Sequence, residues 1–189
     1  ARLRLQRRRG SIAETSRRFG FRALRAEGDQ LLLNGQPAHL RGVLSWGWKP
    51  DTLAPMPTEA EVREEFQRVR ELGFNLYKLC LYVPPEVVFR VADEMGMLLW
   101  LEMPMWWQRL SDHLRQQAAV EYADVFAAVH HHPSVVIYSL GCELSADMAD
   151  ADLLGHLDTL AREVTSGALI CDNSGSGEAY RGLAFDYAD

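Results

Sequence analysis

The chain has 189 residues, of which 48% are hydrophobic, and this is enough to bury a sizeable core in a single domain. No stretch approaches the roughly 18 consecutive apolar residues of a membrane-spanning helix, and the chain does not open with a charged lead and an apolar signal core. We therefore expect a soluble globular chain with no membrane partner.

The net charge of -6 is unevenly distributed, because nine of the twenty basic residues lie within residues 1–25, where Glu14 is the only acid. A basic arm for nucleic acid is one interpretation of this segment. Residues 2–5 (RLRL) alternate as in a half-exposed strand, however, and no aromatic stacking residues separate them. We therefore favour a solvated strand and expect no nucleic-acid partner.

The segment before residue 40 predicts strands and turns. Residues 17–26 (RRFGFRALRA) have a strand-like pattern, and Asn34-Gly35 between two short runs is typical of a two-residue hairpin turn. From residue 40 onward, short apolar runs alternate with longer amphipathic ones. This change predicts strands that alternate with helices.

Local signals mark the ends of these helices. Thr58 and Glu61 form a capping box, and Gly96 ends a helical pattern. Ser111 can cap a long helix, which Pro133 ends. The patterns predict helices over residues 59–72, 85–95, 112–130 and about 146–165, and strands over residues 74–82, 97–104, 134–142 and 168–172.

Nearly continuous apolar strands that alternate with helices indicate a parallel sheet, either open and doubly wound or closed as a (β/α) barrel. The glycine-rich residues 172–182 lack the spacing of a phosphate-binding loop, which weakens a nucleotide-binding interpretation. Polar and aromatic residues instead follow the strands, and barrel active sites form at that end. These residues are Trp46, Trp48, Lys78, Glu102, Trp106, Trp107, Glu143, Asp172 and Asn173.

A complete barrel has eight strand–helix units and typically about 250 residues. From residue 40 onward we count five strands and the possible start of a sixth in residues 183–189. The sequence therefore predicts a partial (β/α)8 TIM barrel of about five units.

Glu143 is the strongest chemical candidate in the chain. It follows the apolar run 134–142, where burial should favour the neutral carboxyl that a general acid needs near neutral pH. The alternative is a structural carboxylate that caps a helix or pairs with an arginine, because perturbed acids are not confined to functional sites.

Residues 132–143 (HPSVVIYSLGCE) resemble the HPSV-I-W-S-L-G-N-E motif of glycoside hydrolase family 2, in which the Glu is the acid/base of a retaining glycosidase. Further segments resemble this family in the same order along the chain. They are FGFR at 19–22, LNGQPAHLRGV at 33–43, LGFN followed by Lys78, and ADEMGMLLWLE at 92–102. The chain has Cys142, Tyr138, Lys78 and Leu81 where the family has Asn, Trp, Arg and His.

The resemblance implies a retaining glycoside hydrolase in the full-length protein, with Glu143 as general acid/base and a carbohydrate as substrate. Residues 1–36 would be the last strands of a β-sandwich domain and a linking hairpin, and residues 37–189 the N-terminal part of a TIM-barrel catalytic domain. The partner of this part is the remainder of the same chain. The residues expected to bind substrate are Lys78, Glu102, Cys142, Trp46 and Trp106.

Retaining glycosidases need a second carboxyl roughly 5 to 5.5 Å from the first. In the resembled family it lies after a seventh strand, and locally only Glu102 and Glu178 are alternatives, so we expect the 189-residue chain alone to be inactive. A carbohydrate-binding or catalytically degenerate barrel is another interpretation, because the thiol of Cys142 is a weaker hydrogen-bonding group than an amide.

Two other chemistries are weighed against this one. The histidine triplet at 130–132 suggests a metal site, but adjacent residues at a helix end point in different directions. Cys142 with His113 or His156 would define a cysteine-dependent hydrolase, although nothing places either base beside the thiol. We interpret the three widely spaced cysteines as reduced core thiols, and we expect no metal and no cofactor.

Overall fold

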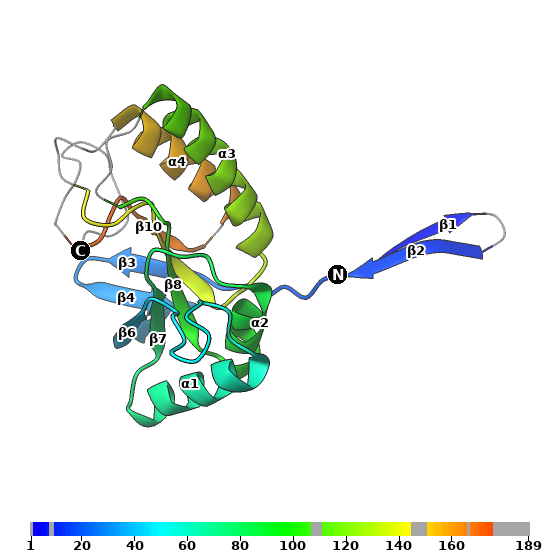
Figure 1. Cartoon of the computed structure of the whole chain (residues 1–189), viewed down its shortest axis with the longest axis horizontal. Helices are drawn as coiled ribbons and strands as arrows, with labels where there is room; N and C mark the ends of the chain where they lie inside the picture. Colours follow the sequence, from blue (N-terminus) through cyan, green and yellow to red (C-terminus); the bar gives the residue numbers. More distant parts are fainter. Residues whose placement is uncertain (1, 8–9, 107–110, 145–150, 166, 176–189) are drawn as a thin grey trace.

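The structure is a computed structural model that describes residues 2–7, 10–106, 111–144, 151–165 and 167–175. Figure 1 shows a two-stranded hairpin at the N-terminal end, β1 (Arg2–Arg7) with β2 (Gly10–Ser16), extending away from a larger α/β part. The predicted strand at residues 2–5 is therefore confirmed. In the described part of the chain, no helix is long and apolar enough to cross a membrane.

Five parallel strands form the sheet of the α/β part, in the spatial order β10-β9-β8-β7-β6. Within this sheet, a helix follows each of the first four strands in chain order, β6 to β9, so all five carboxyl ends meet at one edge. The strands are β6 (Gly42–Ser45), β7 (Leu76–Leu79), β8 (Leu98–Glu102), β9 (Val135–Ser139) and β10 (Leu169–Cys171). The helices are α1 (Glu59–Glu71), α2 (Glu86–Met95), α3 (Asp112–Val129) and α4 (Ala151–Val164).

The helices cover the sheet through one large core. Phe66, Phe89, Phe126 and Leu157, one from each helix, are buried in a single cluster with strand residues such as Tyr138. Burying side chains of this size stabilises the fold by roughly 1.5 to 3 kcal/mol each, before the entropy that is lost on folding. The apolar runs that predicted both elements are thus explained by packing between helices and strands.

A small antiparallel sheet forms a second core against the same strands. It consists of β3 (Leu24–Glu27), β4 (Gln30–Leu33) and β5 (Gln36–Ala38). Leu24 is buried with Ile137 and Leu169, and Leu31 packs against this cluster. The predicted domain boundary after residue 36 falls inside β5, and the assignment of the preceding residues to a sandwich domain stays a prediction.

The predicted local signals are found where expected. Asn34 and Gly35 both have a positive φ, of 52° and 76°, as a type I′ hairpin turn requires, and they join β4 to β5. Thr58 and Glu61 make both hydrogen bonds of a capping box at the start of α1. Gly96 ends α2 in the left-handed conformation.

The predicted strand over residues 17–26 is wrong in its first part, because β3 begins only at Leu24. Residues 17–23 are held by contacts with the start of β9. Gly20 packs so closely on Pro133 that a Cβ would lie 2.7 Å from the ring Cγ. The Arg22 guanidinium donates hydrogen bonds to the carbonyl oxygen of Val135, at 3.0 Å from Nε and 2.6 Å from Nη2. The Arg22 guanidinium thus supplies the hydrogen bonds to this carbonyl that a neighbouring strand would otherwise provide.

Replacing Arg22 with Met is expected to lower the free energy of unfolding by about 1 to 3 kcal/mol, because Val135 is buried and its carbonyl would lose a charged donor. Chemical denaturation would measure this change. Arg25→Met is the control, because Arg25 is exposed on β3 and its loss should change stability by less than about 0.5 kcal/mol. An equal effect of both substitutions would contradict the role given to Arg22.

Candidate functional site

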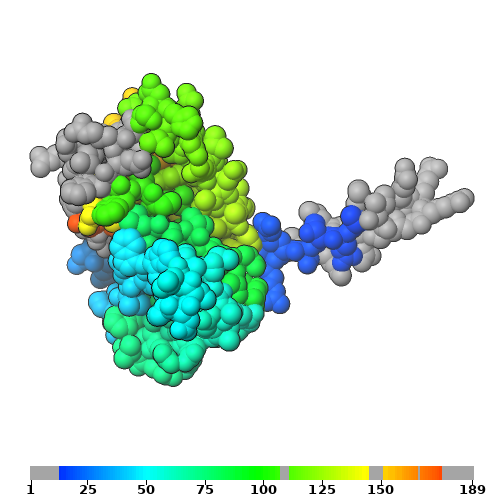
Figure 2. Space-filling view, in the orientation of Figure 1, coloured from blue at the N-terminus to red at the C-terminus, as the bar shows by residue number. Residues whose placement is uncertain are grey.

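Side chains from several strands meet at the carboxyl edge of the sheet. Lys78 lies on β7, Glu102 ends β8, and Glu143 follows β9. Two isolated bridges extend the pairing beyond the strands, because Cys142 pairs with Trp106 on one side and with Ser174 on the other. Figure 2 shows the segments after β8, β9 and β10 reaching the surface side by side, in green, yellow and orange.

The floor of this site is a buried ion pair. Lys78 Nζ lies 2.8 Å from Glu102 Oε1, and the Glu102 side chain has no exposed surface. The same ammonium lies 4.4 Å from the ring centroid of Trp100, which is a favourable cation–π arrangement. The structure thus brings these two predicted site residues together, and each charge fixes the position of the other.

Ser174, which the sequence did not single out, connects this floor to the rest of the site. Its hydroxyl accepts a hydrogen bond from Lys78 and donates one to Glu102, while its backbone carbonyl accepts from the backbone N–H of Glu143 at 2.7 Å. Its Oγ also lies 3.9 Å from the Sγ of Cys142. One buried serine thus joins residues on β7 and β8 to the segment that follows β9.

The Cys142 thiol is mostly buried in this cluster. Burial and the negative charge of Glu102 raise the pKa of Cys142 to about 11, and burial with the same carboxylate raises the pKa of Cys80 to about 12. A nucleophilic cysteine needs a lowered pKa, so this arrangement argues against the cysteine-dependent hydrolase. Cys80, Cys142 and Cys171 are all buried thiols, as predicted for core cysteines.

Glu143 lies at the predicted place, but its predicted burial is wrong because its side chain is exposed. The strand ends at Ser139, and the buried chain continues to Cys142. Glu143 itself has a left-handed backbone with φ 51°, a conformation that non-glycine residues seldom adopt. This turn brings the carboxylate out of the apolar surroundings. Outside them, Oε2 accepts a hydrogen bond from Trp106 Nε1 at 2.8 Å.

The two tryptophans predicted to bind substrate differ in their surroundings. Trp106 is half exposed and bonded to Glu143. Trp46, also half exposed, follows β6 and makes no hydrogen bond, ion pair or ring contact with the residues that the structure describes. Its role in binding stays a prediction. Trp107 and Glu178 lie outside the described residues.

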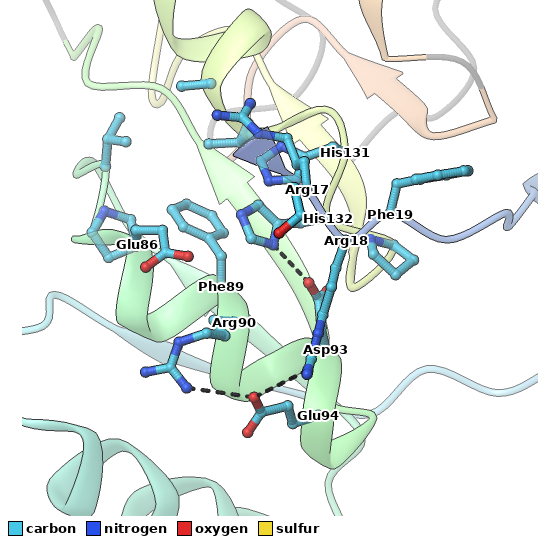
Figure 3. Close-up of a pocket in the computed structure, with 16 residues that line it drawn as sticks. Arg17, Arg18, Phe19, Glu86, Phe89, Arg90, Asp93, Glu94, His131 and His132 are labelled. Carbon is cyan, nitrogen blue, oxygen red and sulfur yellow. Dashed lines mark hydrogen bonds and ion pairs between the residues drawn. The ribbon is translucent and has the colours of Figure 1, made fainter. Parts of the chain in front are cut away.

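A cavity of about 1130 Å³ lies away from this edge, between residues 16–19 and the helices α2 and α3 (Figure 3). His132 lines it, and its Nδ1 makes a 2.6 Å hydrogen bond with Asp93 Oδ2. Among the described residues, no group of three or more His, Cys, Asp or Glu side chains could hold a metal ion. The hydrogen bond to Asp93 on α2 therefore accounts for a histidine at position 132.

Asp93 makes stability depend on pH. Burial opposes its ionisation, but hydrogen bonds from His132 and Ser134 outweigh burial and lower the pKa of Asp93 below its ordinary value. A carboxyl with a lowered pKa stabilises the fold above its unfolded pKa, near 4, and this contribution is lost as the pH falls through the folded pKa. Asp93→Asn should cost about 1 kcal/mol at pH 7.

Urea unfolding at pH 7 and pH 3 would measure this dependence. The difference in stability between Asp93→Asn and the unsubstituted protein should shrink at pH 3, because Asp93 is then largely protonated in the unfolded protein and part of the stabilisation from its lowered folded pKa is lost. A difference of equal size at both pH values would contradict this explanation.

Consecutive parallel β/α units whose functional groups gather at one edge define part of a TIM barrel. The model of the TIM barrel domain of glycosyl hydrolases family 2 matches residues 24–165. The chain belongs to this family, which confirms both the resemblance and the predicted fold class.

Several curated proteins and solved structures are similar to this chain. A beta-galactosidase of Arthrobacter sp. (strain B7) is 28% identical over 176 residues, covering 82% of this chain and 16% of that protein. An exo-beta-D-glucosaminidase of Amycolatopsis orientalis is 26% identical over 160 residues, covering 76% and 15%. The crystal structure of Parabacteroides merdae beta-glucuronidase matches with a TM-score of 0.76 and 25% identity, covering 89% and 23%. The chain spans 13% to 21% of the length of the curated relatives it matches.

Proposed function

We propose that the full-length protein is a retaining glycoside hydrolase in which Glu143 is the general acid/base. The observation that carries this proposal is the exposed Glu143 carboxylate at the carboxyl edge of the sheet, held by Trp106 beside the Lys78–Glu102 pair. A proton donor must reach the glycosidic oxygen, and exposure at the end of a barrel strand allows this contact. The relatives named for galactosidase, glucosaminidase and glucuronidase activities support a carbohydrate substrate.

The roles proposed for the other residues follow from their burial. Lys78 binds substrate from the floor, through hydrogen-bond capacity that the ion pair leaves on the ammonium, and the buried Glu102 orients this ammonium. Glu102 does not fit the role of nucleophile, because it is fully buried and neutralised by Lys78. Glu178, the other local alternative, lies outside the described residues, and the role proposed for the second carboxyl falls to another part of the full-length chain, as in the resembled family.

The inner face of the sheet also supports completion by more of the same chain. A hollow of about 280 Å³ opens on this face. Leu44 on β6, at the edge of the sheet, is about half exposed. Further barrel strands would cover this surface, which is mainly apolar. The residues that line the hollow are Leu31, Leu40, Gly42, Leu44, Leu76, Lys78, Trp100 and Ile137.

A catalytically degenerate barrel that binds carbohydrate is the second candidate, and Cys142 favours it. The resembled family has Asn at this position, whereas a buried neutral thiol is a weak partner for a sugar hydroxyl. In this case the full-length protein would bind a sugar without turning over its glycosides.

Incubation of the full-length protein with p-nitrophenyl β-D-galactoside, glucuronide and glucosaminide tests the proposal. We expect turnover of at least one substrate, with a first-formed product of unchanged anomeric configuration when followed by proton NMR. An inverted product would contradict a retaining mechanism. Sugar binding by calorimetry without turnover of any substrate would favour the degenerate barrel.

A further inference from the structure

The contact between Trp106 and Glu143 is fixed by the backbone on both sides. The backbone N–H of Cys142 donates to the carbonyl of Met105 at 2.8 Å, and Trp106 forms a parallel bridge with Cys142. On the other side, Ser174 accepts the backbone N–H of Glu143. The pairing of these backbone segments, and not the side-chain rotamers alone, therefore places the indole next to the carboxylate.

The chemistry of the indole decides which carboxylate oxygen can carry a proton. The Trp106 N–H is a donor with no acceptor capacity, and it bonds to Oε2 of Glu143. A proton on Oε2 would oppose this donor, so the protonated acid carries its proton on Oε1. Among the described residues, Oε1 accepts no hydrogen bond, which leaves this oxygen available to a substrate.

We propose that Trp106 is a positioning residue for the acid/base step: its indole N–H holds Oε2 of Glu143, so that the transferable proton resides on Oε1 and points toward the leaving group. This inference rests on the proposed glycosidase function. It assigns Trp106 a role through Glu143 that differs from stacking on a sugar ring. Stacking would affect the binding of all substrates that carry the same sugar, whereas positioning affects the transfer of the proton.

Leaving-group dependence separates the two roles. Proton transfer matters most for a basic leaving group such as phenol, and little for 2,4-dinitrophenol, which departs without protonation. In the full-length protein, Trp106→Phe should lower kcat/KM for the phenyl glycoside about tenfold, and that for the dinitrophenyl glycoside less than twofold. Trp48→Phe is the matched comparison, because Trp48 is an exposed tryptophan that follows β6 and makes no hydrogen bond to Glu143. The Trp48→Phe variant should show the same dependence on the leaving group as the unsubstituted protein.

Replacement of Trp106 by benzothienylalanine, in which sulfur stands for the ring N–H, keeps the size of the side chain and removes only the donor. It should reproduce the selective loss, and a protein that keeps full activity on the phenyl glycoside would overturn the inference. An equal loss on both substrates would overturn it in favour of stacking. Glu143→Gln separates failure of this inference from failure of the proposed function. If Glu143→Gln selectively lowers activity on the phenyl glycoside and the Trp106 variants do not, the positioning role alone is refuted. If Glu143→Gln causes no such selective loss of activity, the proposed function is refuted.

Discussion

Substitution of Glu143 by Gln in the full-length protein is expected to lower kcat/KM for a phenyl glycoside by about 10² to 10⁴-fold, the usual contribution of a general acid. Glutamine keeps the size of the side chain but has no proton to transfer. The chain places this carboxylate at the exposed end of a buried strand segment, so the loss of its proton should not disturb the core. Initial rates of phenol release would measure the change.

Glu64→Gln is the matched control for this experiment. It makes the same chemical change on the outer surface of α1, where Glu64 is exposed and pairs with Arg68 one turn later. Its kcat/KM should stay within about twofold, because exposed pairs of this kind contribute little to stability. Similar losses in both variants would show that the effect of Glu143→Gln is not specific to the site.

The second large effect is expected at the Lys78–Glu102 pair. Lys78→Met should lower the free energy of unfolding by about 3 to 5 kcal/mol, because Glu102 would remain fully buried without its cation. Ser174 alone would then neutralise little of this charge. Denaturation of the full-length protein, followed by tryptophan fluorescence, would report the loss because Trp100 contacts Lys78.

The double variant Lys78→Met with Glu102→Gln should recover most of this loss, because it removes both charges. Arg68→Met, at an exposed pair with Glu64, should change stability by less than about 1 kcal/mol. If the double variant is no more stable than Lys78→Met, the loss arises from packing and not from an unpaired charge.

The sequence predicted the elements whose causes are local. The hairpin at Asn34-Gly35 and the capping box of Thr58 depend on neighbouring residues alone, and both were found. Residues 17–23 were predicted as strand from their pattern. Their conformation depends on Arg22 and its bond to a carbonyl 113 residues away, which no local pattern reveals.

The candidate site shows the same division. Lys78, Glu102 and Glu143 could be predicted, because each follows or ends an apolar strand and parallel strands bring such ends together. The exposure of Glu143 could not, because it depends on one left-handed residue beyond the strand. Ser174 was missed because its residue type and its Gly/Ser-rich neighbours are typical of a loop, and its partners lie 72 and 96 residues away.

The assignment of Glu143 as acid/base is tested most directly by azide rescue of Glu143→Ala in the full-length protein with a 2,4-dinitrophenyl glycoside. The small alanine side chain leaves space for azide to attack the glycosyl-enzyme intermediate. Because this variant lacks the general base that activates water, azide should be the better nucleophile. We expect azide to accelerate turnover and to give a glycosyl azide with the anomeric configuration of the substrate, as determined by NMR. A glycosyl azide of inverted configuration would identify Glu143 as the nucleophile, and turnover that azide leaves unchanged would contradict its role as acid/base.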